Sequence, residues 1–223
     1  MRTPALIDPA RIAVVLVDLQ RAYCDPASDA AARLGWEVSA AEQVCRAHGP
    51  FLESLRALLP PERILWLAME ESPITYATNT AYGPALAPDP TRNSFVALSI
   101  RGTPGHDFYL VRPAANEPVF LKVHPSGFSN LDFRLHLDAY QITQLALTGV
   151  IGSRCVNATA ITASSLGYQC LWIGDLIDGP AHLALEMKEH LKVTTFFYAS
   201  LISSQDFVDL LTNSMNEASR NKI

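Results

Sequence analysis

The sequence lacks long apolar runs and clusters of basic residues. Its longest uncharged apolar stretches, Ile12 to Val17 and Ile64 to Met69, have the length of strands, whereas a membrane span needs about 18 to 20 apolar residues. We therefore expect no transmembrane helix and no membrane partner. The 17 Lys and Arg residues face 22 Asp and Glu residues, which gives a net charge of −5. This balance argues against nucleic acid as a partner and favours a small neutral or polar ligand.

The sequence also has few cysteines and no leader pattern. The four cysteines are Cys24, Cys45, Cys155 and Cys170. They have neither CxxC spacing nor the density of a disulfide scaffold, so we expect free thiols, one of which could work as a nucleophile. Charged residues at Asp8 and Arg11 precede the first apolar run. This start does not resemble a signal peptide, and we expect a cytoplasmic protein.

Length and composition favour one large α/β domain. The chain has 223 residues, of which 49% are hydrophobic and 17% charged. This composition excludes a disordered chain or a charged coiled coil, and domains average roughly 150 residues. No linker divides the chain, so we expect residues 1–223 to form a single domain.

Short apolar runs alternate with helical patterns along the chain. The first run, Arg11 to Asp18, is continuously aliphatic, which is typical of a strand buried on both faces. The other predicted strands are Arg63 to Met69, Val119 to Lys122, Gln144 to Gly149, Cys170 to Gly174 and Val193 to Tyr198.

The helical segments lie between these strands. Two predicted helices span residues 39 to 59 and 204 to 212. Two more are placed by one end only: one ends at Gly167, and the other begins at Gly179-Pro180. Alternating strands and helices imply right-handed crossovers. We therefore expect a three-layer α/β/α, Rossmann-like domain with a mostly parallel six-stranded sheet.

Three reactive side chains stand at predicted strand ends. Asp18 closes the first strand, Lys122 closes the third, and Cys155 follows the fourth at the start of a helix. Taken singly, each has a common structural explanation: Asp18 as a cap, Lys122 as a surface charge and Cys155 as a core residue. Because ligands bind at the carboxyl ends of parallel strands, the three together form a set able to perform nucleophilic acyl chemistry.

Several motifs carry a resemblance to a known family. The segment LTGVIGSRCVNATA, from Leu147 to Ala160, resembles the signature of the isochorismatase-like cysteine hydrolases, which include nicotinamidases and N-carbamoylsarcosine amidohydrolase. The segments VDLQ at 17–20, SGF at 126–128 and RGTPG at 101–105 agree with it, in the family's order. The resemblance is specific for fold and catalytic residues and unspecific for substrate.

The resemblance implies a catalytic triad of Asp18, Lys122 and Cys155. Cys155 would be the nucleophile, with its thiolate favoured by a helix N-terminus and by Lys122. Asp18 would take the thiol proton and later deliver it to the leaving amine. The family places a cis peptide between Val150 and Ile151, which would turn the amides of Ile151 and Cys155 into an oxyanion hole.

The departures from the family are informative. Nicotinamidases carry metal-binding Asp and His residues after the second strand, whereas this chain has Met69-Glu-Glu-Ser-Pro73 there. The six histidines show no HxH or i,i+4 pairing. We therefore expect no metal and no cofactor. True isochorismatases replace the nucleophilic cysteine, so Cys155 favours hydrolysis of a C–N bond over hydrolysis of a vinyl ether.

The expected substrate site is small. Its predicted contact residues are Gln20, Tyr23, Phe128, Ile151 and Arg154. Arg154 could bind a substrate carboxylate or be a surface residue, and Gly152 replaces a common threonine. Residues 70–118 are long for a connection and rich in Pro, Thr, Asn and Gly. We expect them to act as a lid or as a contact in a homo-oligomer.

These observations predict a cysteine-dependent amidohydrolase. It would cleave a C–N bond of a small amide, carbamoyl or ureido compound through a thioester acyl-enzyme that water resolves. Two alternatives stay open: an inactive binding or scaffold protein with this fold, and a redox-sensing thiol protein.

Overall fold

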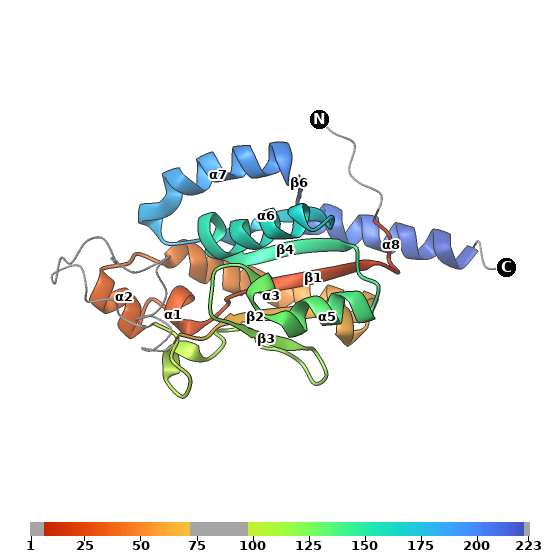
Figure 1. Ribbon diagram of the computed structural model, residues 1–223. Coiled ribbons are helices and arrows are strands. Elements are labelled where there is room, and N and C mark those ends of the chain that lie inside the picture. The colour runs from red at the N-terminus through yellow and green to blue at the C-terminus, as the bar shows by residue number, and fades with distance from the viewer. Residues whose placement is uncertain (1–6, 72–97, 221–223) are drawn as a thin grey trace.

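The computed structural model of the chain describes residues 7–71 and 98–220 (Figure 1). Among these residues, six strands form one parallel sheet in the order β3-β2-β1-β4-β5-β6. The strands are β1 (Ile12–Val17), β2 (Ile64–Met69), β3 (Val119–Lys122), β4 (Gln144–Val150), β5 (Gln169–Asp178) and β6 (Ala199–Ile202). Every residue of β1, β2 and β4 is buried, as their continuous apolar sequences predict.

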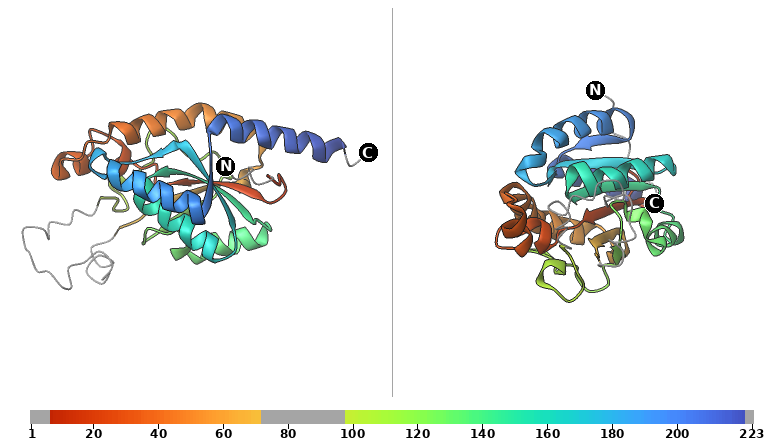
Figure 2. Two further views of the ribbon diagram at one scale, coloured as in Figure 1. Left: turned by 90° about the horizontal axis from the view of Figure 1, so that it is seen from above. Right: turned by 60° about the vertical axis from the view of Figure 1, so that its left-hand side comes forward.

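Helices cover both faces of this sheet. The helices are α1 (Arg21–Cys24), α2 (Asp29–Leu34), α3 (Ser39–Leu58), α5 (Leu131–Ala139), α6 (Asn157–Ser165), α7 (Ala184–Phe197) and α8 (Ser204–Arg220). Figure 2 shows α3 and α8 on one side of the sheet and α5 and α6 on the other, with α7 packed beside α6. The predicted three-layer α/β/α fold is therefore confirmed.

The predicted strand from Val193 to Tyr198 is wrong. Residues 193 to 197 form the last turns of α7, and the sixth strand is Ala199–Ile202, in register with Cys170 to Ile173 of β5. The run is rich in β-branched and aromatic residues, which favour strands, but tertiary context overrides such propensities. The final helix is also longer than predicted, because α8 continues to Arg220.

The predicted lid lies largely outside the described residues. Of residues 70–118, the structure describes 70 and 71 and resumes at Leu98. From there the chain passes through a short helical turn at Pro104–His106 and reaches β3.

Strands β1 and β4 approach each other closely near their carboxyl ends. The pairing of β4 with β5 shifts in register between Leu147 and Gly149. Gly149 has a φ of +109°, and a Cβ there would overlap the backbone of Val17. Only glycine tolerates both conditions. The ends of β1 and β4 can therefore lie directly beside each other.

Candidate active site

Lys122 and Asp18 form a buried ion pair at the carboxyl edge of the sheet. Asp18 follows β1, and Lys122 is the last residue of β3, with β2 between the two strands. Two strand spacings separate them by roughly 10 Å of backbone, a gap that the long lysine side chain can bridge. Lys122 Nζ donates a hydrogen bond to Asp18 Oδ2 at 2.8 Å, and both side chains are at most 1% exposed.

The backbone of Asp18 is strained. Its φ of +51° lies in the left-handed region, which costs a residue with a Cβ about 1 kcal/mol or more. The amide of Asp18 donates to the carbonyl of Leu67 at 2.9 Å, and its own carbonyl accepts from the amide of Gln20 at 2.7 Å. These bonds hold a turn that aims the carboxylate across the sheet edge.

One oxygen of Asp18 remains open. Oδ1 is buried and accepts no hydrogen bond of good geometry within the described part of the chain. The Cys155 thiol lies close enough to interact with both Asp18 and Lys122. Buried polar atoms without partners are uncommon and call for an explanation. An oxygen that receives the thiol proton during a reaction provides one.

The pKa values of the three groups bear on one expectation. Burial raises the pKa of Cys155 to about 12, and the lowering effect of Lys122 does not overcome it. Burial also raises the pKa of Asp18, against the effect of Lys122. Lys122 favours the thiolate, as the sequence analysis expects, but burial of the sulfur outweighs this effect. Desolvation penalises the charged sulfur, and the nucleophile rests as a thiol.

Lys122 nevertheless keeps its charge. Burial by itself would lower the pKa of Lys122, but Asp18 and Cys155 together raise it above the ordinary value for lysine. A buried ammonium paired with a carboxylate stays protonated. The resting site therefore holds a carboxylate, an ammonium and a neutral thiol.

The turn that carries Cys155 has an unusual backbone. The peptide between Val150 and Ile151 is cis, and residues Gly152–Val156 form a π-helical turn that leads into α6. Thr159 Oγ1 donates to the carbonyl of Cys155 at 2.7 Å and accepts from the amide of Gly127 at 3.0 Å. This hydroxyl ties the nucleophile turn to the loop that follows Lys122.

Helix α7 supports the other side of the same turn. His190 Nδ1 lies 2.9 Å from the carbonyl of Ser153, to which it can donate. Thr194 Oγ1 donates to Asn157 Oδ1 at 2.5 Å, at the start of α6. These two contacts anchor α7 to both ends of the segment that carries Cys155.

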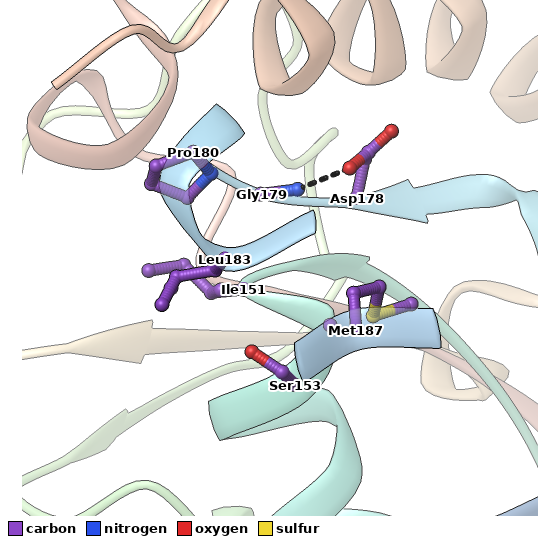
Figure 3. A pocket seen from close by; sticks show the side chains of 8 residues that line it. Ile151, Ser153, Asp178, Gly179, Pro180, Leu183 and Met187 are labelled. Atoms are coloured by element: carbon purple, nitrogen blue, oxygen red, sulfur yellow. Dashed lines mark hydrogen bonds between the residues drawn. The ribbon is translucent and has the colours of Figure 1, made fainter. Parts of the chain in front are cut away.

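A hollow lies beside the turn, and the crowding at its wall explains why position 152 is a glycine. It is lined by Ile151, Gly152, Ser153, Asp178, Gly179, Pro180, Leu183 and Met187 (Figure 3). A Cβ at Gly152 would overlap the end of the Met187 side chain and Cγ2 of Ile177. Met187 therefore occupies the space that a larger residue at position 152 would need. Ser153 Oγ, also at this hollow, is buried and lacks a hydrogen-bond partner among the described residues.

Gln20 has a role different from the predicted one. Its side-chain amide donates to the carbonyls of Met69 and His106, both at 2.9 Å, and its Oε1 accepts from the amide of Met69 at 2.8 Å. The residue is fully buried. Because both N–H groups are used by the backbone, we assign Gln20 to positioning β2 against the end of β1, and not to contact with substrate.

Tyr23 lies close enough to Asp18 and Cys155 for their charges to affect its pKa. Its hydroxyl is 3.0 Å from Ser99 Oγ and 3.5 Å from Glu71 Oε1. Burial raises the pKa of Tyr23 well above its ordinary value, with further contributions from Glu71, Asp18 and Cys155. Neither Glu71 nor Ser99 was placed in the site by the sequence analysis. The position of Glu71 directly after the second strand was the available signal.

Phe128 and Arg154, also predicted to contact substrate, are less buried than Gln20, Tyr23 and Ile151. Phe128 is half-buried and packs against Phe133 and Tyr168, with ring centroids 5.1 and 5.5 Å away. The side chain of Arg154 is 56% exposed and forms an ion pair with Glu186 at 3.0 Å. This pairing favours the surface interpretation of Arg154.

The two described residues that directly follow β2, Glu70 and Glu71, do not form part of a metal-binding cluster. Glu70 accepts two hydrogen bonds from Arg101, at 2.7 and 3.1 Å, and lies 3.5 Å from His106. Within residues 7–71 and 98–220, no three His, Cys, Asp or Glu side chains gather closely enough to bind a metal. Metal independence stays a prediction. Over the same ranges, every helix is too short or too polar to cross a membrane.

The fold and the site define the class of the isochorismatase-like hydrolases. The Isochorismatase domain model matches residues 12–204, and the chain belongs to this family. A cysteine hydrolase from Pseudomonas syringae pv. phaseolicola 1448A superimposes with a TM-score of 0.76 at 18% identity, covering 96% of this chain and 100% of that chain. The pyrazinamidase of Pyrococcus horikoshii, solved in complex with zinc, has a TM-score of 0.68 at 16% identity, covering 86% and 99%.

One curated relative is more similar in sequence over a shorter stretch. Streptothricin hydrolase of Streptomyces noursei is 41% identical over 74 residues, which make up 33% of this chain and 27% of that protein. The aligned stretch thus spans about a quarter of the relative.

Proposed function

We propose that this protein is a cysteine-dependent amidohydrolase that acts on a small amide, carbamoyl or ureido compound in the cytoplasm. The observation that carries the proposal is the buried Asp18–Lys122 ion pair, 2.8 Å long, with the Cys155 thiol beside it. A buried carboxylate next to a thiol suits general base catalysis.

The first step joins proton transfer to attack. The S–H proton of Cys155 moves to Asp18 Oδ1 while the sulfur bonds to the substrate carbonyl carbon. Because the pKa of Cys155 is about 12, only about one thiol in 10⁵ would ionise unaided at pH 7. The carboxylate therefore has to take the proton as the sulfur attacks. Lys122 stays protonated. Its positive charge stabilises the negative charge on Asp18 before the proton transfer and on the reacting atoms after it.

The amides of Ile151 and Cys155 would stabilise the oxyanion that forms on the substrate. Donors aimed at a developing oxyanion are worth about 3 to 4 kcal/mol each in comparable sites. When the intermediate collapses, Asp18 returns its proton to the leaving amine, and the acyl group stays on sulfur as a thioester. Asp18, again a carboxylate, then takes a proton from water as the water oxygen attacks the thioester carbon. The C–S bond breaks, Asp18 returns that proton to the Cys155 sulfur, and the acid leaves.

The surroundings of the sulfur favour a compact substrate. Cys155 is 9% exposed, and Tyr23 and Ile151 are similarly buried. A buried site of this kind suits a small molecule and excludes a folded polymer. The names of two relatives place streptothricin and pyrazinamide in the panel of compounds to be tested.

Ammonia release from a panel of small amides, carbamoyl compounds and ureides tests this proposal. We expect turnover of at least one class, no cleavage of long peptides, and loss of turnover in Cys155→Ala. Cys170→Ala is the matched control, because Cys170 is also buried with its pKa raised to about 12 but lies on β5. If the protein binds a panel member and the Cys155→Ala variant turns it over equally well, the proposal is refuted. Binding without any turnover would favour the scaffold alternative.

A further inference from the structure

Helix α7 has two different sides. Through His190, Thr194 and Met187 it contacts the segment that carries Cys155. On its other side it exposes large apolar side chains, with Leu185 81% and Phe196 66% exposed. Exposed apolar residues in a group, unlike scattered ones, mark interaction surfaces.

Four exposed residues of α7 form a row, which we call the outer row: Leu185, Glu189, Lys192 and Phe196. Their spacing of four, three and four residues is the repeat that keeps side chains on one face of a helix. At 100° per residue they fall within an arc of about 60°. The outer row is therefore apolar at both ends and charged in the middle, where Lys192 Nζ lies 2.8 Å from Glu189 Oε1.

This order of residues is self-complementary. If a second α7 packs antiparallel across a two-fold axis between residues 190 and 191, Leu185 faces Phe196 of the second copy. Glu189 then faces Lys192, and each contact occurs twice, as an isologous interface requires. A parallel arrangement would instead place like charges opposite each other.

We propose that the outer row of α7 is a homodimer interface, in which two copies of this chain pair antiparallel through α7. The flanking residues Val193 and Phe197, 52% and 65% exposed, extend the apolar ends, and the rings of Phe196 and Phe197 already pack edge to face. A membrane surface fits this row less well, because helices that lie on membranes present a continuous apolar face. Binding to an unrelated protein would not require the outer row to be self-complementary, whereas pairing with a second copy does.

The size of the helix sets the expected affinity. The 14 residues of α7 span about 21 Å, which is short for an interface of about 800 Å² per partner. We therefore expect a reversible dimer with a dissociation constant on the order of micromolar. Its population should depend on protein concentration.

Charge reversal tests the pairing. Sedimentation equilibrium of the full chain over a concentration series measures the dimer dissociation constant. Glu189→Lys alone, or Lys192→Glu alone, should weaken the dimer about tenfold, because each places like charges opposite each other twice. The double variant Glu189→Lys/Lys192→Glu should restore the wild-type constant to within about threefold. Phe196→Ser should weaken the dimer by about tenfold or more.

An exposed leucine on another helix supplies the control. Leu131 on α5 is 67% exposed and lies outside the outer row, so Leu131→Ser should leave the dissociation constant unchanged. Hydrogen exchange of the unaltered protein should show protection of residues 184–197 that increases with concentration, a measurement that needs no variant. A monomer at all concentrations, a dimer lost in Leu131→Ser, or a double reversal that does not recover would each overturn the proposal.

Discussion

Replacing Asp18 by asparagine should change two properties of Cys155 in opposite directions. The substitution removes the carboxylate while preserving its shape, and asparagine tolerates the left-handed φ of +51° at this position. Hydrolysis should fall by about 10² to 10⁴ in kcat/KM, the usual contribution of a general base. Alkylation of Cys155 should instead become faster.

The acceleration follows from the charges around the sulfur. The carboxylate of Asp18 raises the pKa of Cys155, whereas Lys122 lowers it. In Asp18→Asn the ammonium loses its partner, and the thiolate becomes its remaining counter-ion. A neighbouring charge of this kind shifts a pKa by about 1 to 3 units, so the thiolate fraction at pH 7 should rise about tenfold or more.

The assay follows iodoacetamide labelling of individual cysteines by mass spectrometry, beside ammonia release on the same samples. Cys170 is an internal control, because burial alone raises its pKa to about 12 and Asp18 does not contribute. Its labelling rate should be the same in both proteins. Since removing one partner of a buried ion pair costs about 3 to 5 kcal/mol of stability, circular dichroism and the Tm have to show that the variant is folded. Unchanged hydrolysis, or slower labelling of Cys155 in the folded variant, would refute the assignment of Asp18 as base.

Three further predictions concern stability and metal. His48 is buried, with its ring nitrogens 2.7 Å from the carbonyl of Val44 and 2.6 Å from Thr148 Oγ1, and burial lowers its pKa from 6.5 to about 4. The stabilisation from neutral His48 is complete above pH 6.5 and is lost as the pH falls through 4. The free energy of unfolding, measured with urea, should therefore fall by about 3 kcal/mol over this range, and most of this fall should be absent in His48→Gln. Gly152→Thr should cost about 1 to 3 kcal/mol through overlap with Met187, and the added substitution Met187→Ala should recover part of that cost in thermal unfolding. Exhaustive dialysis against EDTA should leave activity unchanged, because Glu70 is already paired with Arg101; activity that disappears and returns with zinc would contradict this.

Much of the fold, and the meeting of Asp18 with Lys122, could be predicted because the relevant signals are local. Continuous aliphatic runs mark β1, β2 and β4, and the residues that follow a strand lie at the sheet edge whatever the details of the packing. Asp18, Lys122 and Cys155 were chosen as candidate site residues in this way, and their catalytic roles stay a prediction. The meeting of Asp18 with Lys122 requires only the parallel topology and a lysine long enough to reach across β2.

What could not be predicted depends on residues distant in the sequence. The high pKa of Cys155 results from burial by several elements at once, so the charge of Lys122 and the helix start were misleading when taken alone. Gly152 appeared as an unexplained departure because Met187, 35 positions later, fills its space. Val193 to Phe197 have strand propensity, yet β5 pairs with the short Ala199–Ile202 segment instead.

The resting thiol and the proposed mechanism are compatible because the proton transfer conserves charge inside the site. Before attack, the buried groups are the carboxylate of Asp18, the ammonium of Lys122 and a neutral thiol. After the proton moves, they are a carboxylic acid, the same ammonium and a negative sulfur. The ion pair passes from Asp18–Lys122 to Cys155–Lys122, and no net charge enters or leaves the low-dielectric interior.

Desolvation, which raises the pKa of both Asp18 and Cys155, therefore largely cancels in the transfer itself. It still opposes a free thiolate formed by loss of the proton to solvent. In the proposed mechanism, burial of Cys155 would keep the sulfur neutral toward solvent electrophiles, and the sulfur would become a nucleophile only when a carbonyl carbon is placed against it.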